Sequence, residues 1–175
     1  MFISNEKLSL RMAEPQDSDL IYRWENDRSV WRASETSVPV SQFQIDQFLL
    51  GNNDLVANRQ LRLMIDLKGE PQPIGSIDLF EYDAVNQRIG IGILLDSHYR
   101  NQGLASQALR LTLTYLFEDL MVHQVHCLIN EQNLDSQRLF ERAGFVRSGQ
   151  LKDWIRTPQG FLDVFYYQLI NHSQP

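Results

Sequence analysis

A turn between a predicted strand and a predicted helix carries the residue types that bind an anion. Over residues 94–106 (Leu-Leu-Asp-Ser-His-Tyr-Arg-Asn-Gln-Gly-Leu-Ala-Ser) a strand ends, a polar turn follows, and a helix begins at a glycine. A helix start exposes unpaired N–H groups and carries about half a positive charge. Gly103 and Ala105 let an anion approach the backbone closely, and Arg100 adds a full positive charge. The pattern predicts a phosphate site, and an ordinary turn before a helix is the alternative interpretation.

A second segment with a polar helix start lies downstream. Residues 133–146 read Asn-Leu-Asp-Ser-Gln-Arg-Leu-Phe-Glu-Arg-Ala-Gly-Phe-Val. This pattern predicts a helix from Leu134 to Arg142, entered by Asn133 and closed by Gly144-Phe145. A helix and a strand are predicted between the two segments. Two such motifs in this order, with these elements between them, are hard to obtain by chance.

Together the two segments resemble the motifs of the GCN5-related N-acetyltransferase (GNAT) superfamily. Its cofactor motif, [RQ]-x-x-G-x-[GA], is matched by Arg100, Gly103 and Ala105. Its second motif, N-x-x-[SA]-x-x-[LI]-[YF]-x-x-x-G-F, is matched by Asn133, Ser136, Leu139, Phe140, Gly144 and Phe145. The resemblance extends over nearly the whole chain. Residues 10–11, 17–24 and 163–167 are similar to the branch that contains spermidine acetyltransferases and ribosomal-protein N-terminal acetyltransferases.

The resemblance implies acetyl-CoA as the co-substrate and indicates which residues would hold it. The pantetheine arm would lie between strands 88–95 and 123–129, with Asn133 hydrogen-bonded along it. Backbone groups of Ile93, Leu94 and Leu95 would pair with this arm, and an N–H of the same strand would stabilise the oxyanion of a tetrahedral intermediate. The residues that would cradle the pyrophosphate are Arg100, Asn101, Gln102, Gly103, Leu104, Ala105 and Ser106.

Two carboxylates in the predicted strand 74–82 are candidates for the general base. Direct transfer needs a neutral amine, and an amine with a pKa near ~10.4 is under roughly 0.1% neutral at pH 7. A carboxylate removes such a proton directly or through water. The resemblance to the GNAT superfamily implies acidic residues on this strand, so Glu81 is the first candidate and Asp78 the second. Solvated carboxylates at a strand edge are an equally good interpretation of both.

The residue that protonates the departing CoA thiolate is left open by the second motif. Many relatives use a tyrosine where this chain has Phe140, and phenylalanine has no proton to donate. Ser136, one helical turn earlier, is the nearest substitute, because a serine at this place is implicated in ribosomal-protein acetyltransferases. A helix-surface serine that is hydrogen-bonded locally explains Ser136 equally well. The thiolate can also leave unprotonated.

Three further residues are candidates for binding the acceptor amine. Glu35, in a predicted loop, would hold the positive end of a polyamine, although solvation alone explains an isolated loop acid. Trp31 and Trp154 lie in segments that vary on the acceptor side of this architecture. Either tryptophan would line the amine pocket.

The elements that position these residues follow in a simple order. A strand (8–12) precedes two helices (from Asp17 or Ser18 to Asn26, and after Ser41), three strands (61–67, 74–82, 88–95), a helix (103–119), a strand around Cys127, a helix (134–142), a strand beginning at Gly144-Phe145 and a hairpin (150–156 with 161–169). This order predicts one α+β domain over residues 1–175. We expect a GNAT-like fold with a mixed, mostly antiparallel twisted sheet flanked by about four helices.

Composition excludes several classes of protein. Hydrophobic residues make up 43% and charged residues 22%, as in ordinary globular proteins. No apolar run approaches the ~20 residues that cross a bilayer, and residues 1–7 lack a signal-peptide pattern, so we expect a cytoplasmic protein without a membrane partner. The net charge of −6 argues against a nucleic-acid partner and is compatible with a cationic substrate. The lone cysteine and the spacing of the histidines predict no metal site.

Three functions compete at this point. The leading hypothesis is an acetyltransferase for a small amine such as a polyamine or diamine. A protein N-terminal acetyltransferase is a close second, because such enzymes also lack the tyrosine and act on a peptide N-terminus. A catalytically weak acyl-CoA-binding domain is the third. The branch also implies a homodimer or larger homo-oligomer, in which the aromatic strand 161–169 would form an interface or belong to the core.

Overall fold

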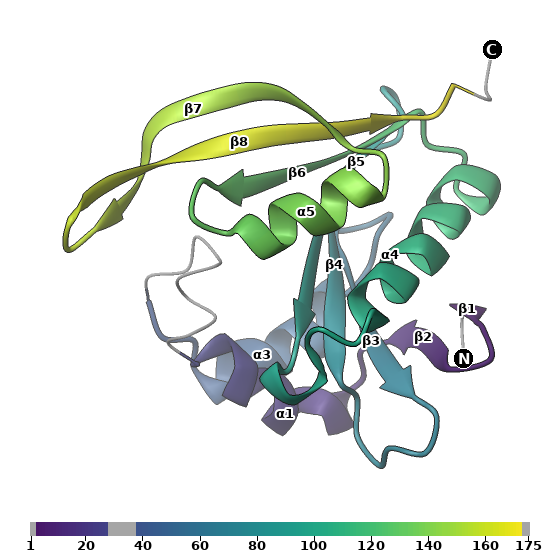
Figure 1. Cartoon of the computed structure of the whole chain (residues 1–175). Coiled ribbons are helices and arrows are strands. Elements are labelled where there is room, and N and C mark those ends of the chain that lie inside the picture. Colours follow the sequence, from purple (N-terminus) through teal and green to yellow (C-terminus); the bar gives the residue numbers. More distant parts are fainter. Residues whose placement is uncertain (1–2, 28–37, 173–175) are drawn as a thin grey trace. The chain divides into compact units, whose positions relative to one another are not determined.

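The computed structural model describes residues 3–27 and 38–172 (Figure 1). Its internal contacts divide the chain into two compact units. The first comprises Met1–Ala13, Gly51–Val125 and Ile170–Pro175, and the second comprises Glu14–Leu50 and His126–Leu169. Each unit therefore combines segments that lie far apart in the sequence.

The first unit is built on an antiparallel meander. Its strands are β1 (Ile3–Ser4), β2 (Leu8–Met12), β3 (Leu61–Leu67), β4 (Gly75–Asp83) and β5 (Arg88–Leu95), and each pairs with the next. The predicted three-strand meander is confirmed within a residue of its expected bounds. β1 was not predicted, since two residues are too short for an alternating pattern to show.

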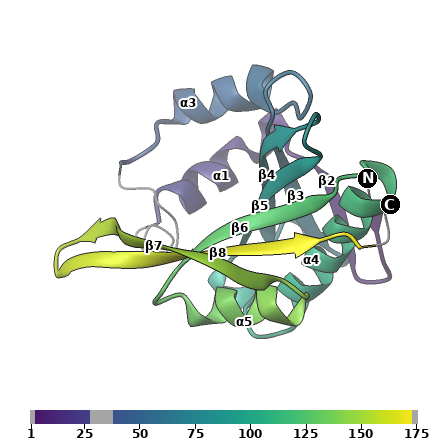
Figure 2. The same cartoon turned by 90° about the horizontal axis from the view of Figure 1, so that it is seen from above.

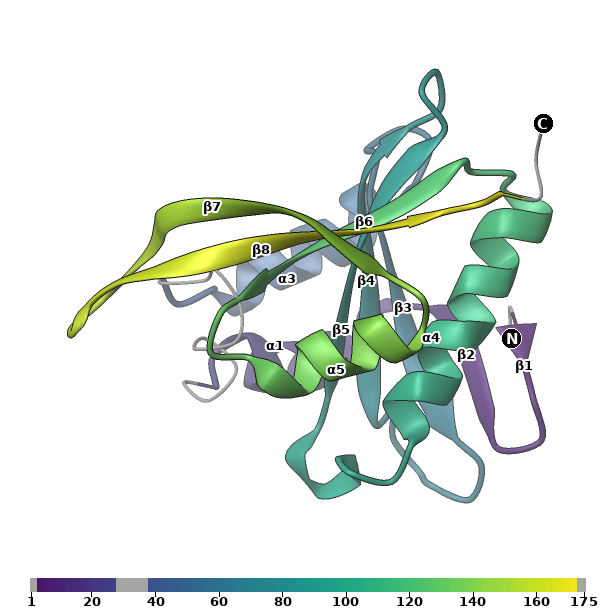
Figure 3. The same cartoon turned by 45° about the horizontal axis from the view of Figure 1, so that its top comes forward.

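One face of this meander is an apolar core. Alternate side chains of β3, β4 and β5 are at most 1% exposed: Leu63, Ile65, Ile77, Leu79, Ile89 and Ile91. Helix α4 (Leu104–Thr114) contacts β1, β2 and β5 (Figure 3), and its Ala108 and Leu109 are fully buried. The predicted helix 103–119 continues as a π-helical turn, Tyr115–Asp119. Strand alternation thus gives the meander a buried apolar face, and α4 buries apolar side chains of its own in the same unit.

Among the described residues, the second unit contains three α-helices, most of β6 (Gln124–Asn130), β7 (Val146–Thr157) and most of β8 (Gly160–Ile170), with the strands in the order β6-β8-β7. A short 3-10 helix, Pro15–Asp17, precedes α1 (Ser18–Glu25). Helix α3 (Gln42–Gln47) begins at Ser41, whose side chain accepts from the Gln44 N–H, and runs into a π-helical turn, Phe48–Asn52. Helix α5 (Leu134–Arg142) has the predicted bounds.

The hairpin of β7 and β8 is longer than the sequence predicts. One twelve-residue strand, Val146–Thr157, replaces the separate strand expected at Gly144-Phe145 and the hairpin arm expected at 150–156 (Figure 2). Gly144 adopts φ 96°, which ends α5, and the strand begins two residues later. The hairpin arms are antiparallel, with a shift of register within β7.

The predicted fold class is confirmed. The described residues contain four α-helices, and every strand pair with a defined register is antiparallel. The chain is therefore α+β with a mostly antiparallel sheet. The extent of the single domain, residues 1–175, stays a prediction.

Candidate functional site

The turn between β5 and α4 is tied to the end of the strand. A 3-10 turn, Ser97–Tyr99, follows Asp96, whose side chain accepts from the His98 N–H at 3.1 Å. Arg100 Nε then donates to the carbonyl of Leu95 at 3.0 Å, which uses one of the five N–H donors of the guanidinium. The Tyr99 hydroxyl donates to Glu70 in the β3–β4 turn at 2.9 Å. These bonds hold Arg100 beside the carboxyl end of β5.

The start of α4 has the features of an anion site. Gly103 is its N-cap with φ 73°, no side chain caps the helix, and the first helical bond runs from the Gln107 N–H to the Gly103 carbonyl at 3.2 Å. In the described chain, no acceptor meets the N–H groups of residues 104–106. The place where a Cβ of Gly103 would stand is open to 4 Å. Free amide donors, an open approach and the adjacent Arg100 fit a pyrophosphate.

The predicted pantetheine residues lie on the strand that leads into this turn. Ile93, Leu94 and Leu95 are the last residues of β5, and on β4 they pair with residues 77, 76 and 75. The first unit therefore brings together residues 93–95 and 100–106, as the sequence predicts. Their contact with pantetheine stays a prediction.

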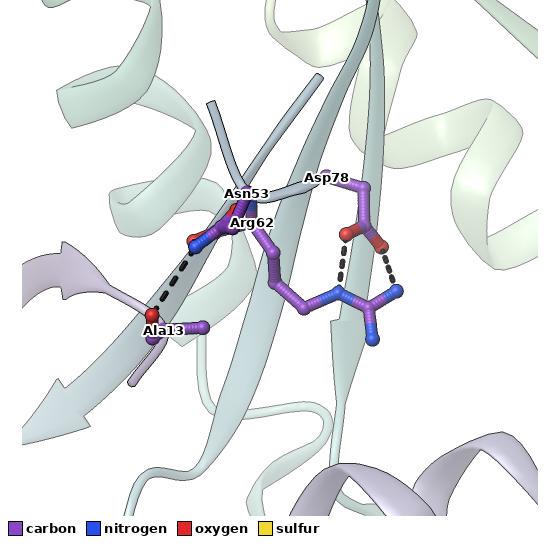
Figure 4. Close-up of polar contacts among 4 residues, drawn as sticks. All are labelled: Ala13, Asn53, Arg62 and Asp78. Atoms are coloured by element: carbon purple, nitrogen blue, oxygen red, sulfur yellow. Dashed lines mark hydrogen bonds and ion pairs between the residues drawn. The ribbon is translucent and has the colours of Figure 1, made fainter. Parts of the chain in front are cut away.

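Asp78 has a partner that no sequence motif indicates. Both of its carboxylate oxygens accept from Arg62, at 2.5 Å from Nε and 3.1 Å from Nη2 (Figure 4). The two residues face each other in the β3·β4 register. Asn53 holds the Arg62 backbone, because its Oδ1 accepts the Arg62 N–H at 2.6 Å while its Nδ2 donates to Ala13 O at 3.2 Å. Asp78 is thus half of a cross-strand ion pair.

Glu81 occupies a β-bulge near the end of β4. The register of β4 with β5 shifts between Phe80 and Asp83, and Glu81 within that shift has φ 53° and an exposed side chain. Asp78 lies opposite Gly92, next to the predicted pantetheine residues. Glu81 is three residues farther along, roughly 10 Å at the usual strand rise. The two candidate bases therefore differ in position: Asp78 lies nearer to these residues and is paired with Arg62, and Glu81 lies farther away with an exposed side chain.

The second unit holds the residues of the second motif. Asn133 is the N-cap of α5, and its Oδ1 accepts from the Ser136 N–H at 3.2 Å. The Ser136 hydroxyl, on a half-buried side chain, forms no hydrogen bond within the described ranges. Asn133 keeps its Nδ2 donors available for a ligand, because only Oδ1 serves the helix.

Trp154, one of the candidates for binding the acceptor amine, lies in the β7 bulge. Residues 152–154 of β7 oppose the single residue Asp163 of β8, and Asp153 has φ 50°. Asp163 fills the bulge by accepting from the Asp153 N–H at 2.9 Å and from Lys152 Nζ at 2.6 Å. The bond to Lys152, together with those to Asp153 and Gln150, lowers the pKa of Asp163. Trp154 is 52% exposed. Trp31 and Glu35 lie outside the described residues.

The described chain shows neither a reactive cysteine nor a metal-binding cluster. Cys127 is 2% exposed, and burial raises the pKa of its thiol, so it is a core residue. Within residues 3–27 and 38–172, no cluster of three histidine, cysteine or acidic side chains is suited to hold a metal. No helix in these ranges is both long and apolar enough to cross a membrane.

Most of the chain matches a known protein family. The sequence model of a family described as "Acetyltransferase (GNAT) domain" matches residues 7–146, well over half of the chain. The chain belongs to the GNAT acetyltransferase family. It is accordingly an N-acetyltransferase that uses acetyl-CoA, and the resemblance found in the sequence is confirmed.

Several acetyltransferases are similar to it over most of their length. Spermidine N(1)-acetyltransferase of Escherichia coli is 24% identical over 85% of this chain and 77% of that protein. YdaF of Bacillus subtilis, provisionally named a ribosomal N-acetyltransferase, is 25% identical over 97% and 94%. A crystal structure of spermidine N-acetyltransferase from Vibrio cholerae, in complex with CoA and spermine, superposes with a TM-score of 0.86 at 22% identity, covering 95% of this chain and 96% of that one. This last likeness confirms the GNAT-like fold.

This GNAT chain carries Phe140 at the motif position where many relatives carry a tyrosine. The side chain is 3% exposed, and its ring packs edge-on against Phe145 with centroids 5.0 Å apart. The ring of Phe140 therefore packs in the core of the second unit. The residues that sequence reasoning missed, Arg62 and Asn53, sit in or beside a strand without any motif. Only the β3·β4 register identifies Arg62 as the partner of Asp78.

Proposed function

We propose that the protein acetylates a primary amine of a small polyamine or diamine by direct transfer from acetyl-CoA through a tetrahedral intermediate. The uncapped start of α4, with Arg100 tied to the end of β5, is the observation that carries the CoA half of this proposal. The acceptor half is supported by the similarity to the E. coli spermidine acetyltransferase and by the net charge of −6, which favours cationic ligands.

Acetyl-CoA binds in this proposal along β5 and onto the start of α4. Backbone groups of residues 93–95 pair with pantetheine, and Asn133 Nδ2 donates to the same arm. The N–H groups of residues 104–106 and the guanidinium of Arg100 receive the pyrophosphate. Asn101, Gln102 and Gly103 shape the turn between these donors.

Glu81 is the proposed general base. The amine loses its proton to Glu81, directly or through water, and its nitrogen attacks the thioester carbonyl. The tetrahedral intermediate then expels the CoA thiolate, and its nitrogen loses the remaining extra proton to that thiolate, which leaves the neutral amide and the CoA thiol. Asp78 is the weaker candidate despite its position beside Gly92, because both of its oxygens already accept from Arg62. An N–H of β5 supports the oxyanion.

Ser136 is the proposed donor to the departing thiolate. Its hydroxyl lies in the first turn of α5 and forms no bond within the described part of the chain, so it is available to a ligand. On the acceptor side, Glu35, Trp31 and Trp154 are proposed to receive the amine. We also propose a homo-oligomer, because the spermidine N-acetyltransferase of Vibrio cholerae, a fold neighbour with a TM-score of 0.80, forms a dodecamer.

Acetylation of a peptide N-terminus is the alternative. Phe140 in place of the tyrosine, together with Ser136, favours it, and so does the similarity to YdaF. Polyamine acetylation remains our first proposal because the acidic balance of the chain suits a polycation.

The decisive experiment measures CoA thiol release with acetyl-CoA and panels of polyamines, diamines, amino acids, aminoglycosides and short peptides. We expect the highest kcat/KM with a polyamine or diamine. Preference for peptides would replace the first proposal by the alternative. Thermal stabilisation by acetyl-CoA without release on any amine would leave a binding domain and refute both enzyme proposals.

A further inference from the structure

The loop before β3 is a closed turn that presents Arg59. Asp54 Oδ1 accepts from the N–H groups of Val56 and Ala57, both at 2.8 Å, and the Asp54 carbonyl accepts from the Asn58 N–H at 3.0 Å. Arg59 then adopts φ 59°, a left-handed conformation that few non-glycine residues hold. The hydrogen bonds of the loop therefore bring one arginine to a defined place.

That place is the bulge of β4. Tyr82 donates its N–H to the carbonyl of Arg59 at 3.1 Å, and Arg59 Nε donates to the carbonyl of Tyr82 at 2.6 Å. A bulge takes residues out of the strand ladder, so both backbone groups of Tyr82 need partners elsewhere. Arg59 supplies both, with its backbone for one and its side chain for the other.

The far side of the bulge is held just as firmly. Asp83 accepts from the Asn86 N–H at 3.0 Å and from Asn86 Nδ2 at 2.8 Å, and Arg88 Nη2 lies 3.1 Å from its carboxylate. These Asn86 bonds, followed by the charges of Arg88 and Arg59, lower the pKa of Asp83 to about 2. Glu81 lies between Phe80 and the two residues held by these contacts, Tyr82 and Asp83, and it has φ 53°. Non-glycine residues keep such a conformation only where their surroundings impose it, and such sites cluster where function needs a fixed geometry.

We propose that Arg59 is a positioning residue for acetyl transfer, which holds Tyr82 by both backbone groups and thereby fixes the place from which Glu81 accepts the amine's proton. This inference rests on the proposed function, because Glu81 is the base there. Arg59 acts on the position of Glu81 and touches neither acetyl-CoA nor the amine.

The test is a double-mutant cycle on kcat. Arg59→Asn removes the guanidinium and keeps the turn, since asparagine tolerates the left-handed region. We expect kcat to fall roughly tenfold, as for loss of one hydrogen bond from a charged donor, with the Kd for CoA unchanged. Glu81→Gln alone should cost roughly a hundredfold or more. In the Glu81→Gln background, Arg59→Asn should cost less than about twofold further, because its effect passes through Glu81.

Arg142→Asn is the matched control. Arg142 is exposed, and its side chain takes part in no hydrogen bond or ion pair within the described ranges, so kcat should stay unchanged. If Arg59→Asn fails to fold, Arg59→Lys, which keeps the charge and loses the Nε donor, enters the same cycle.

Three outcomes separate the hypotheses. A full tenfold cost of Arg59→Asn in the Glu81→Gln background, or no cost in the wild type, overturns the positioning role and leaves the proposed function intact. An unchanged kcat in Glu81→Gln overturns both the base assignment and the role of Arg59. Absence of thiol release from the wild-type protein with every amine refutes the proposed function itself.

Discussion

The helices of the two family motifs begin in opposite ways. Helix α4 starts at Gly103, a residue without a side chain, and the N–H groups of its first turn meet no acceptor in the described chain. Helix α5 starts at Asn133, whose Oδ1 accepts the Ser136 N–H. One helix start has no side-chain cap, and the other is capped by the side chain of Asn133. The difference supports the proposal that the α4 segment, of these two polar turns before a helix, takes the pyrophosphate.

Gly103→Glu should break the open start of α4. The substitution forces a side chain onto φ 73° and places a negative charge where we propose that the phosphates bind. Like-charge contact costs several kcal/mol, so we expect CoA affinity to fall by more than roughly a hundredfold in calorimetric titration. Gly160→Glu is the control, because Gly160 also has positive φ and open space around its Cβ position. Equal loss of CoA affinity in both variants would contradict this phosphate site.

Arg100→Ala should weaken the same site without closing it. Charge-assisted hydrogen bonds are worth about 1.5–3 kcal/mol, so the Kd for CoA should rise roughly ten- to a hundredfold. Arg100→Lys keeps the charge and loses the Nε bond to Leu95, and its Kd should lie between those of the wild type and Arg100→Ala. An unchanged Kd in the alanine variant would remove Arg100 from the anion site.

Ser136→Ala tests whether the first turn of α5 serves chemistry as well as structure. Asn133 caps the backbone N–H of residue 136, which alanine retains, so the free energy of unfolding should change by less than about 0.5 kcal/mol. We expect kcat to fall roughly tenfold, less than for a typical general acid, because a thiolate is already a fair leaving group. Thiol release measures kcat, and urea unfolding of the same preparation measures the free energy of unfolding. An unchanged kcat would mean that the thiolate leaves unprotonated.

Two substitutions of Asn133 distinguish its role as a helix cap from its proposed role in binding acetyl-CoA. Asn133→Ala should lower the free energy of unfolding by about 1 kcal/mol in urea, through loss of the cap. Asn133→Asp keeps an acceptor at the helix start and should retain stability, while losing the Nδ2 donors. We expect its KM for acetyl-CoA to rise about fivefold, the worth of one hydrogen bond. A wild-type KM in Asn133→Asp would show that the cap is the only role of this side chain.

Local signals account for what could be predicted. The bounds of α5 follow from Asn133 at one end and Gly144 at the other, and the meander follows from alternating strands with turn residues between them. The β7–β8 hairpin was predicted with too short a β7, because the bulge at residues 152–154 interrupts the alternation. Asp163 on β8 stabilises that bulge, and no residue near 152–154 in the sequence signals it.

The sequence by itself determined the family, the order of elements and the open helix start at Gly103, because each depends on residues close together in the chain. Only the tertiary structure decided which residues contact Asp78 and the bulge that contains Glu81. Arg62 meets Asp78 only through the β3·β4 register, and Arg59 reaches the Glu81 bulge from a loop more than twenty residues away in sequence. Register is a property of paired strands, and a slip of one residue would turn every side chain to the other face. No pattern within a single strand contains that information.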